Sequence, residues 1–129
     1  SKLLECICDG APDKDTAITV AKSVVCSSLF KAAMFGEDAN WGRVLCAIGY
    51  ADAEFDINKV NVDLRSKYGT VEVCKNGSGI EFSEEKAAKV LSSDEIYIDI
   101  NLNQGNENAT AWGCDLTYDY VKINGDYRT

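Results

Sequence analysis

Histidine is absent from this 129-residue chain, which also has one proline, one methionine and no long hydrophobic run. Without histidine the chain cannot by itself form a Ser-His-Asp or Cys-His catalytic arrangement, and it lacks the commonest protein ligand of zinc. Its longest apolar stretch is far too short to span a bilayer, and no secretory signal is visible. Histidine-dependent catalysis within this chain is therefore excluded, and we expect no membrane association.

Positive charge is also scarce in this chain. Thirteen Lys and Arg residues stand against 21 Asp and Glu, which gives a net charge of −8. Nucleic-acid binding depends mainly on Lys and Arg side chains that replace condensed counterions, so we expect no nucleic-acid partner. Hydrophobic residues make up 46% of the chain, which excludes disorder throughout. Together with the length, this composition predicts a single domain over residues 1–129.

The six cysteines are distributed along the whole chain, at positions 6, 8, 26, 46, 74 and 114. An even count in a short chain is compatible with disulfides, but no C-x-x-C pair is present, so a zinc ribbon or a thioredoxin-like site lacks its signature. Cys6 and Cys8 share one strand face, and the other four stand singly in apolar runs, where free cysteine packs as a small hydrophobe. We expect reduced core thiols in a cytoplasmic protein and no metal site; paired thiols are the alternative.

Hydrophobic spacing predicts the elements of the first third of the chain. Residues 3–8 alternate with a period close to two and are typical of a strand. Apolar residues three and four apart predict a helix over 15–30, with Asp15 as its N-cap. The segment 35–43, with two glycines and two acids, is typical of a loop, and Asn40 is expected to cap the helix that follows.

The middle of the chain predicts a hairpin and a helix. Residues 60–64 and 70–74 alternate apolar and polar side chains, and 65–69 is the expected hairpin loop between them. The sequence Asn-Gly-Ser-Gly at 76–79 predicts a turn. A helix should follow with Ser83 as its N-cap, because acidic residues in the first turn are stabilised by the helix dipole.

The last third predicts the centre of the sheet and a terminal helix. Residues 96–102 show the clearest half-buried alternation in the chain, so we expect a central or near-central strand. Residues 109–114 are expected to be its hairpin partner, and 116–123 have helical spacing. Strands and helices alternate without a regular βαβ repeat, which predicts an α+β fold: a mixed, largely antiparallel sheet with helices packed on one face.

Two features have a chemical interpretation beside a structural one. Glu37 and Asp38, next to Trp41, would suit general acid–base catalysis, although acids before a helix more often serve its dipole and solvent. A free amino group can activate the hydroxyl of Ser1, as in N-terminal nucleophile hydrolases, although a frayed chain start is the ordinary expectation. The residues alone thus describe an acidic α+β domain with a polar Gly/Trp loop.

Longer segments carry a resemblance to a known family. Phe-Gly-Glu-Asp-Ala-Asn-Trp-Gly-Arg at 35–43, and Ala-Thr-Ala-Trp-Gly-Cys-Asp-Leu-Thr-Tyr-Asp-Tyr-Val at 109–121 with Asn-Gly-Asp-Tyr-Arg-Thr at 124–129, closely resemble the bifunctional ornithine acetyltransferase and glutamate N-acetyltransferase of arginine biosynthesis. The similarity is to the C-terminal part of its beta chain and covers essentially the whole sequence. The departures are Ala39 in place of a proline and Gly125 in place of an alanine.

The resemblance implies an enzyme of which this chain is one part. Members of the family move acetyl from N2-acetyl-L-ornithine to L-glutamate by a ping-pong mechanism, through an acetylated threonine that autocatalytic cleavage frees as a new N-terminus. This chemistry needs neither histidine nor metal. The nucleophilic threonine and the oxyanion hole lie upstream of the segment matching Ser1, so the resemblance implies no catalytic residue in this chain. Thr110 belongs to the C-terminal motif and is not the cleavage-site threonine.

The resemblance also implies two substrate-binding residues, Asn124 and Thr129. An asparagine amide both donates and accepts, and a chain end adds a carboxylate beside a hydroxyl, which suits an amino-acid zwitterion. The alternative is a frayed chain end that binds nothing. The loop residues Glu37, Asp38 and Trp41 are expected to organise a loop near the site or the subunit contact.

The implied partners are the alpha chain and the upstream beta-chain segment of the same precursor, in a hetero-oligomer. The implied ligands are N-acetylornithine, ornithine and glutamate. No cofactor is expected, with acetyl-CoA as an alternative acetyl donor, and the isolated chain is expected to be inactive. The alternative hypothesis is a stand-alone small-molecule-binding or interaction domain without acetyl transfer.

Overall fold

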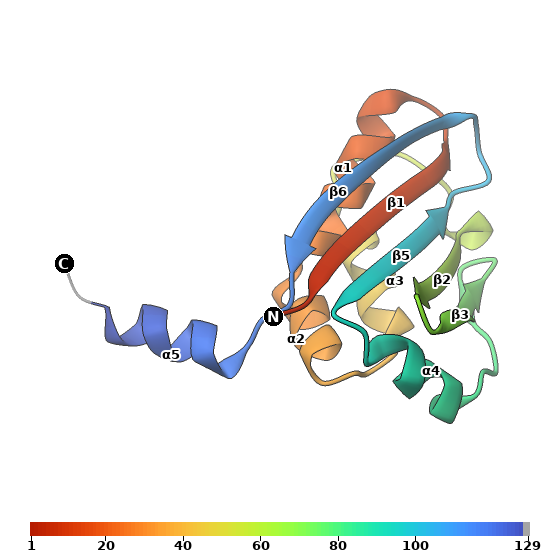
Figure 1. Ribbon diagram of the computed structural model, residues 1–129. Helices are drawn as coiled ribbons and strands as arrows, with labels where there is room; N and C mark the ends of the chain where they lie inside the picture. The colour runs from red at the N-terminus through yellow and green to blue at the C-terminus, as the bar shows by residue number, and fades with distance from the viewer. Residues whose placement is uncertain (128–129) are drawn as a thin grey trace.

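Six strands form one mixed sheet in the computed structural model, which describes residues 1–127 (Figure 1). The strands are β1 (Leu3–Ala11), β2 (Asn61–Ser66), β3 (Gly69–Lys75), β4 (Ser78–Gly79), β5 (Glu95–Asn101) and β6 (Glu107–Cys114). Their order in the sheet is β4-β3-β2-β5-β1-β6. Only β1 and β5 are parallel among the paired strands of residues 1–127. The predicted α+β class with a largely antiparallel sheet is confirmed.

The helices of the body lie on one face of the sheet, as predicted. They are α1 (Lys14–Val25), α2 (Ser28–Phe35), α3 (Trp41–Gly49), the 3₁₀ turn η1 (Ile57–Lys59) and α4 (Glu84–Leu91). Figure 1 shows α1 and α3 behind the sheet, while α4 contacts β2 and β3. In the described part of the chain no single helix is long and apolar enough to cross a membrane, although α1 and α2, bent by 54°, pass such a test as a pair.

The two faces of the sheet differ because successive side chains of a strand point to opposite sides. One face packs under the helices, and removing its aliphatic side chains from water stabilises the fold by roughly 1.5 to 3 kcal/mol for each large one. The strand residues buried there are Leu4, Cys6, Cys8, Val62, Leu64, Val71, Val73, Ile96, Ile98 and Ile100. Within residues 1–127 no helix covers the other face, which we call the open face. The alternation of buried and less buried residues places Glu5, Ile7, Asp63, Arg65, Glu72, Tyr97, Asp99, Thr110 and Trp112 on it.

Helix caps confirm two predictions and correct a third. Asn40 and Ser83 cap α3 and α4, since their side chains accept the backbone N–H groups of the third residues along. The predicted cap of α1 is wrong: Asp13 accepts the N–H of Thr16 at 2.7 Å, and Asp15 lies in the first turn. The N-cap is the residue immediately before the helix, which is Asp13. The sequence has an aspartate at both 13 and 15, so the residue type alone does not identify the cap.

The single helix predicted over 15–30 is instead two helices, α1 and α2. The first helix ends at Val25, with Cys26 as its C-cap. Ser27 is the N-cap of α2, and its side chain accepts the N–H of Phe30 at 3.2 Å. Apolar residues continue at helical spacing across the break, so the hydrophobic pattern alone conceals it. The serine side chain offers the backbone a competing partner and starts a new helix.

The predicted pairing of 109–114 is wrong. β6 pairs with β1, in antiparallel register, and β1 separates it from β5. The β5–β6 connection passes over the end of β1, where Leu102 and Gln104 donate backbone N–H groups to Asp9 and Gly10. Gly105 permits the crossing, because a Cβ there would lie 2.2 Å from the Ala11 carbonyl oxygen.

The hairpin loop and the terminal helix are present, but their bounds differ from those predicted. The hairpin loop expected over 65–69 contains only Lys67 and Tyr68, because the strands continue to Ser66 and from Gly69. The terminal helix exists as α5 (Tyr118–Asp126), but none of its residues is buried. It projects away from the body as an arm (Figure 1).

Candidate functional site

The arm carries the predicted substrate-binding residue Asn124. Its side chain is exposed, and its amide donates to the carbonyl oxygen of Tyr120 at 2.8 Å, one turn earlier in the same helix. The second predicted substrate residue, Thr129, lies outside the described residues. Large side chains line the arm and are exposed: Tyr118, Tyr120, Val121, Ile123 and Tyr127. Asn124 therefore lies on an arm whose large apolar and aromatic side chains are exposed.

The base of the arm is fixed by the chain start. Asp115 is buried; its carboxylate accepts the Lys2 backbone N–H at 2.8 Å, and its own N–H donates to the Lys2 carbonyl at 3.2 Å. The Leu116 N–H donates to the carbonyl of Lys31 in α2 at 3.2 Å. The arm therefore leaves the body at a position held by Lys2, just before β1, and by α2.

The two segments that carry the family resemblance meet at this base. Phe35, at the end of α2, packs edge-on against Tyr118, with ring centroids 5.2 Å apart. The Lys2 ammonium reaches Glu37 at 3.3 Å. Residues more than eighty positions apart in sequence are thus brought together, which spacing along the chain alone does not reveal.

Structural contacts account for the residues of the 35–43 loop. Glu37 adopts a left-handed backbone conformation (φ 56°), and the Asp38 N–H closes α2 by donating to Ala33. The Asp38 carboxylate accepts the amide of Asn40 at 3.1 Å. A Cβ on Gly79 would lie 2.2 Å from the Trp41 ring, so the indole packs directly on β4. The geometry gives these residues the organising role expected of them and assembles no acid–base pair.

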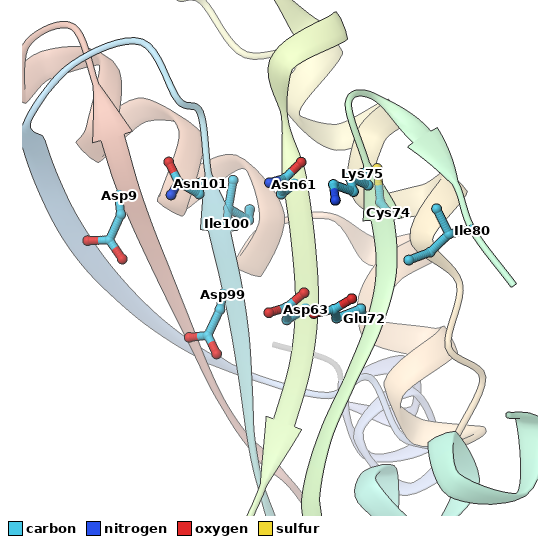
Figure 2. A pocket seen from close by; sticks show the side chains of 10 residues that line it. All are labelled: Asp9, Asn61, Asp63, Glu72, Cys74, Lys75, Ile80, Asp99, Ile100 and Asn101. Atoms are coloured by element: carbon cyan, nitrogen blue, oxygen red, sulfur yellow. The ribbon is translucent and has the colours of Figure 1, made fainter. Parts of the chain in front are cut away.

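A second candidate region is a hollow of about 330 Å³ at one end of the open face (Figure 2). Carboxylates from four strands border it: Asp9, Asp63, Glu72 and Asp99. One lining residue, Lys75, is a cation. The side-chain amides of Asn61 and Asn101 also line the hollow. No three His, Cys, Asp or Glu side chains within residues 1–127 are grouped so that they could hold a metal ion. The hollow is therefore an acidic surface.

The strand register explains the electrostatics of this hollow. Asp63 faces Glu72 on one side and Asp99 on the other. Desolvation raises the pKa of Asp63, and the charges of Glu72 and Asp99 raise it further. Asp99 is compensated by Arg65, whose guanidinium binds it through two nitrogens at 2.8 and 3.1 Å. The hydrogen bonds to Asp99 also raise the pKa of Arg65.

Sequence reasoning missed this cluster of charges. Each acid occupies the polar position of an alternating strand, which is typical of a solvated face. Their proximity depends on which strands are neighbours and in what register, and no local pattern contains that information.

The cysteines correct a further expectation. Cys6, Cys8 and Cys74 are buried, but Cys26, Cys46 and Cys114 are exposed, so the prediction of core thiols is wrong for half of them. All six are free thiols. Burial raises the pKa of the Cys8 thiol to about 12 and also raises those of Cys6 and Cys74, which keeps these thiols protonated and unreactive at neutral pH.

Known proteins resemble this chain along its entire length. The sequence model of the ArgJ family matches residues 1–129. The arginine biosynthesis bifunctional protein ArgJ 1 of Clostridium acetobutylicum is 54% identical over 129 residues, which are 100% of this chain and 32% of that protein. The corresponding protein of Caldanaerobacter subterraneus subsp. tengcongensis is 51% identical, with the same coverage. The chain thus spans about one third of the length of these curated relatives.

A solved structure agrees with the fold. The crystal structure of the arginine biosynthesis bifunctional protein ArgJ from Bacillus halodurans superposes with a TM-score of 0.88 and 41% sequence identity. The match covers 98% of this chain and 58% of the solved chain. With the family model matching every residue, the chain belongs to the ArgJ family.

Proposed function

We propose that this chain is the C-terminal part of the nucleophile-bearing beta chain of an arginine-biosynthesis acetyltransferase. The enzyme moves acetyl from N2-acetyl-L-ornithine to L-glutamate through an acetyl-threonine. Acetyl passes from the donor's amide nitrogen to the threonine oxygen with release of ornithine, and then to the amino group of glutamate, which frees the threonine. The 129 residues contribute part of the substrate site, and the nucleophile comes from outside them.

The family match over residues 1–129 is the observation that carries this proposal. The relative lengths support the view that the chain is part of a processed enzyme. The same residues make up 58% of the solved relative's chain but only 32% of the curated Clostridium relative. A relative crystallised as a chain much shorter than the full-length proteins is what cleavage of a precursor would produce.

The arm supports the substrate-binding part of the proposal. Asn124 is exposed on α5, where its amide remains accessible to a ligand, and the apolar side chains around it are unburied. An isolated helix of nine residues is marginal in water, so a surface outside the described residues would stabilise it. The site that Asn124 serves would then be completed by the alpha chain or by the upstream part of the beta chain.

The proposal includes the setting of the enzyme. Ornithine, N-acetylornithine and glutamate are its ligands, the alpha chain is its partner in a hetero-oligomer, and the cytoplasm is its location. Acetyl-CoA remains the proposed alternative acetyl donor, with no other cofactor.

Trapping of the acetyl group tests the proposal. The complete protein that contains these residues is incubated with N-acetylornithine in the absence of glutamate, digested and analysed by mass spectrometry. We expect one added acetyl group on a threonine outside residues 1–129, and its loss when glutamate is added. The peptide that contains Ser1 should remain unmodified.

Two results would contradict the proposal. Acetyl on the Ser1 peptide would assign the nucleophile to this chain. Absence of any trapped acetyl, in a protein that binds ornithine by calorimetry, would favour the alternative of a binding domain without acetyl transfer.

A further inference from the structure

The open face of the sheet is unusual in its charge pattern. Glu72, Asp63 and Asp99 stand directly opposite one another on β3, β2 and β5. Figure 2 shows the carboxylates of Asp63 and Glu72 side by side, with Asp99 on the next strand and Asp9 beyond it. Like charges directly opposite on neighbouring strands destabilise a sheet. We call Glu72, Asp63 and Asp99 the acidic row. Repulsion among their charges lowers the stability of the sheet when the described residues are considered alone.

The cations near the row only partly offset this cost. Arg65 is committed to Asp99 through two hydrogen bonds, and its guanidinium also stacks 4.3 Å above the ring of Tyr97. Lys75 also lines the hollow, but within residues 1–127 it forms no ion pair with these carboxylates. No hydrogen bond or ion pair within residues 1–127 reaches the side chain of Asp63 or Glu72. Desolvation already penalises the charged form of Asp63. Positive charge from outside the described residues would remove the repulsion.

A second row of the open face has the composition of a protein contact. Register places Arg65, Tyr97, Glu5 and Trp112 in line across β2, β5, β1 and β6. The Trp112 indole donates to Glu5 at 2.5 Å, and the residue as a whole is 62% exposed. Tryptophan, tyrosine and arginine are the residues enriched at the energetic centres of interfaces. The open face therefore joins an aromatic row to an acidic one.

We propose that in the complete protein this face is covered by a lysine- or arginine-bearing segment of the same polypeptide, from the part that lies outside these 129 residues. The inference rests on the proposed function, in which the chain is part of a longer protein. Relatives three times as long supply enough chain for the purpose. The acidic row selects a basic segment, and the Trp112 row gives it an apolar contact.

The sign of a stability change tests the proposal. In the complete protein, Asp63→Asn should lower the melting temperature by about 2 °C or more, because it removes the partner of a covering cation. On an uncovered face the same substitution would raise the melting temperature, since it relieves repulsion from Glu72 and Asp99. The matched control is Asp52→Asn, which removes an exposed charge from the loop between α3 and η1. An unchanged or raised melting temperature for Asp63→Asn overturns the proposal.

Chemical labelling gives an independent measurement that needs no variant. Carbodiimide-driven coupling of glycine ethyl ester to carboxylates, followed by peptide mapping, compares Glu72 with Glu54, which is also exposed in the described structure. We expect at least tenfold slower labelling of Glu72 in the complete protein, at every protein concentration. Equal rates would show an uncovered face, and protection that is lost on dilution would assign the cover to a second copy. Either result overturns the proposal.

The outcomes separate this proposal from the proposed function. A protein that traps acetyl but labels Glu72 rapidly refutes only the covered face. A protein that traps no acetyl but protects Glu72 refutes only the enzymatic proposal.

Discussion

At the scale of single residues, Asn124 combines exposure with weak attachment. Within the described residues, its side chain has one hydrogen-bond partner, the carbonyl oxygen of Tyr120 in the same helix. A side chain of this kind contributes little to folding, because surface substitutions away from caps and networks usually change stability by less than about 0.5 kcal/mol. Any effect of replacing it therefore reports on binding.

Asn124→Ala in the complete enzyme should raise the KM for N-acetylornithine about tenfold, because an amide that binds a charged amino acid contributes roughly 1.4 kcal/mol. Precursor cleavage and the melting temperature should not change. Steady-state kinetics with each substrate varied in turn provide the measurement. Asn106→Ala, in the exposed loop before β6, is the control. Unchanged kinetics for both substrates would refute a binding role for Asn124.

At the scale of elements, the cap of α1 distinguishes two neighbouring acids. Asp13→Ala should lower the melting temperature more than Asp15→Ala, because only Asp13 accepts the Thr16 N–H. Asp15 contributes through the helix dipole alone. Thermal unfolding of the two variants compares them directly. A larger loss for Asp15→Ala would mean that the helix begins two residues later.

The same cap predicts a pH dependence. Hydrogen bonds from Thr16 lower the pKa of Asp13 below its usual value. A lowered pKa in the folded state stabilises the fold above the unfolded pKa, and this stabilisation is lost as pH falls through the folded pKa. The difference between wild type and Asp13→Ala should therefore be largest at neutral pH and shrink in acid.

Local signals predicted most elements because they depend on near neighbours. The cap at Ser83 and the alternation of Ile96, Ile98 and Ile100 act over a few residues, and the structure confirms both. The order of the strands in the sheet was not predicted, because it depends on pairing between strands that are far apart in the sequence. The short connection after Leu102 favours a hairpin between β5 and β6. Instead, the connection crosses the end of β1 at Gly105, and β6 pairs with the far side of β1.

The candidate site was predicted only through family resemblance. Asn124 was identified because its segment matches a known motif, whereas no physical signal in the sequence marks it. The acidic row could not be predicted, since Asp63, Glu72 and Asp99 become neighbours only through the register of three strands. Side-chain alternation predicts which face a residue occupies, but not which residues share it.

At the scale of the whole molecule, the arm and the body are separable. None of the residues of α5 is buried, so ending the 129-residue chain after Thr117 should leave its free energy of unfolding within about 1.5 kcal/mol of the unshortened chain, the value of the lost Phe35–Tyr118 ring pair. In the complete enzyme the same truncation should abolish activity. Urea unfolding of the 129-residue chain and of its shortened form measures the difference. Loss of the cooperative transition would show that the arm supports the body.

The position of β1 has a consequence for synthesis. The first strand lies between β5 and β6, and Lys2 is bonded to Asp115, 113 residues later. A chain emerging from the ribosome thus carries β1, with its apolar Leu4 side, long before either neighbour exists. Non-local pairings of this kind close large loops and form slowly. The body becomes foldable only once β6 has been made, so a ribosome that stalls before Cys114 would leave the centre of the sheet open.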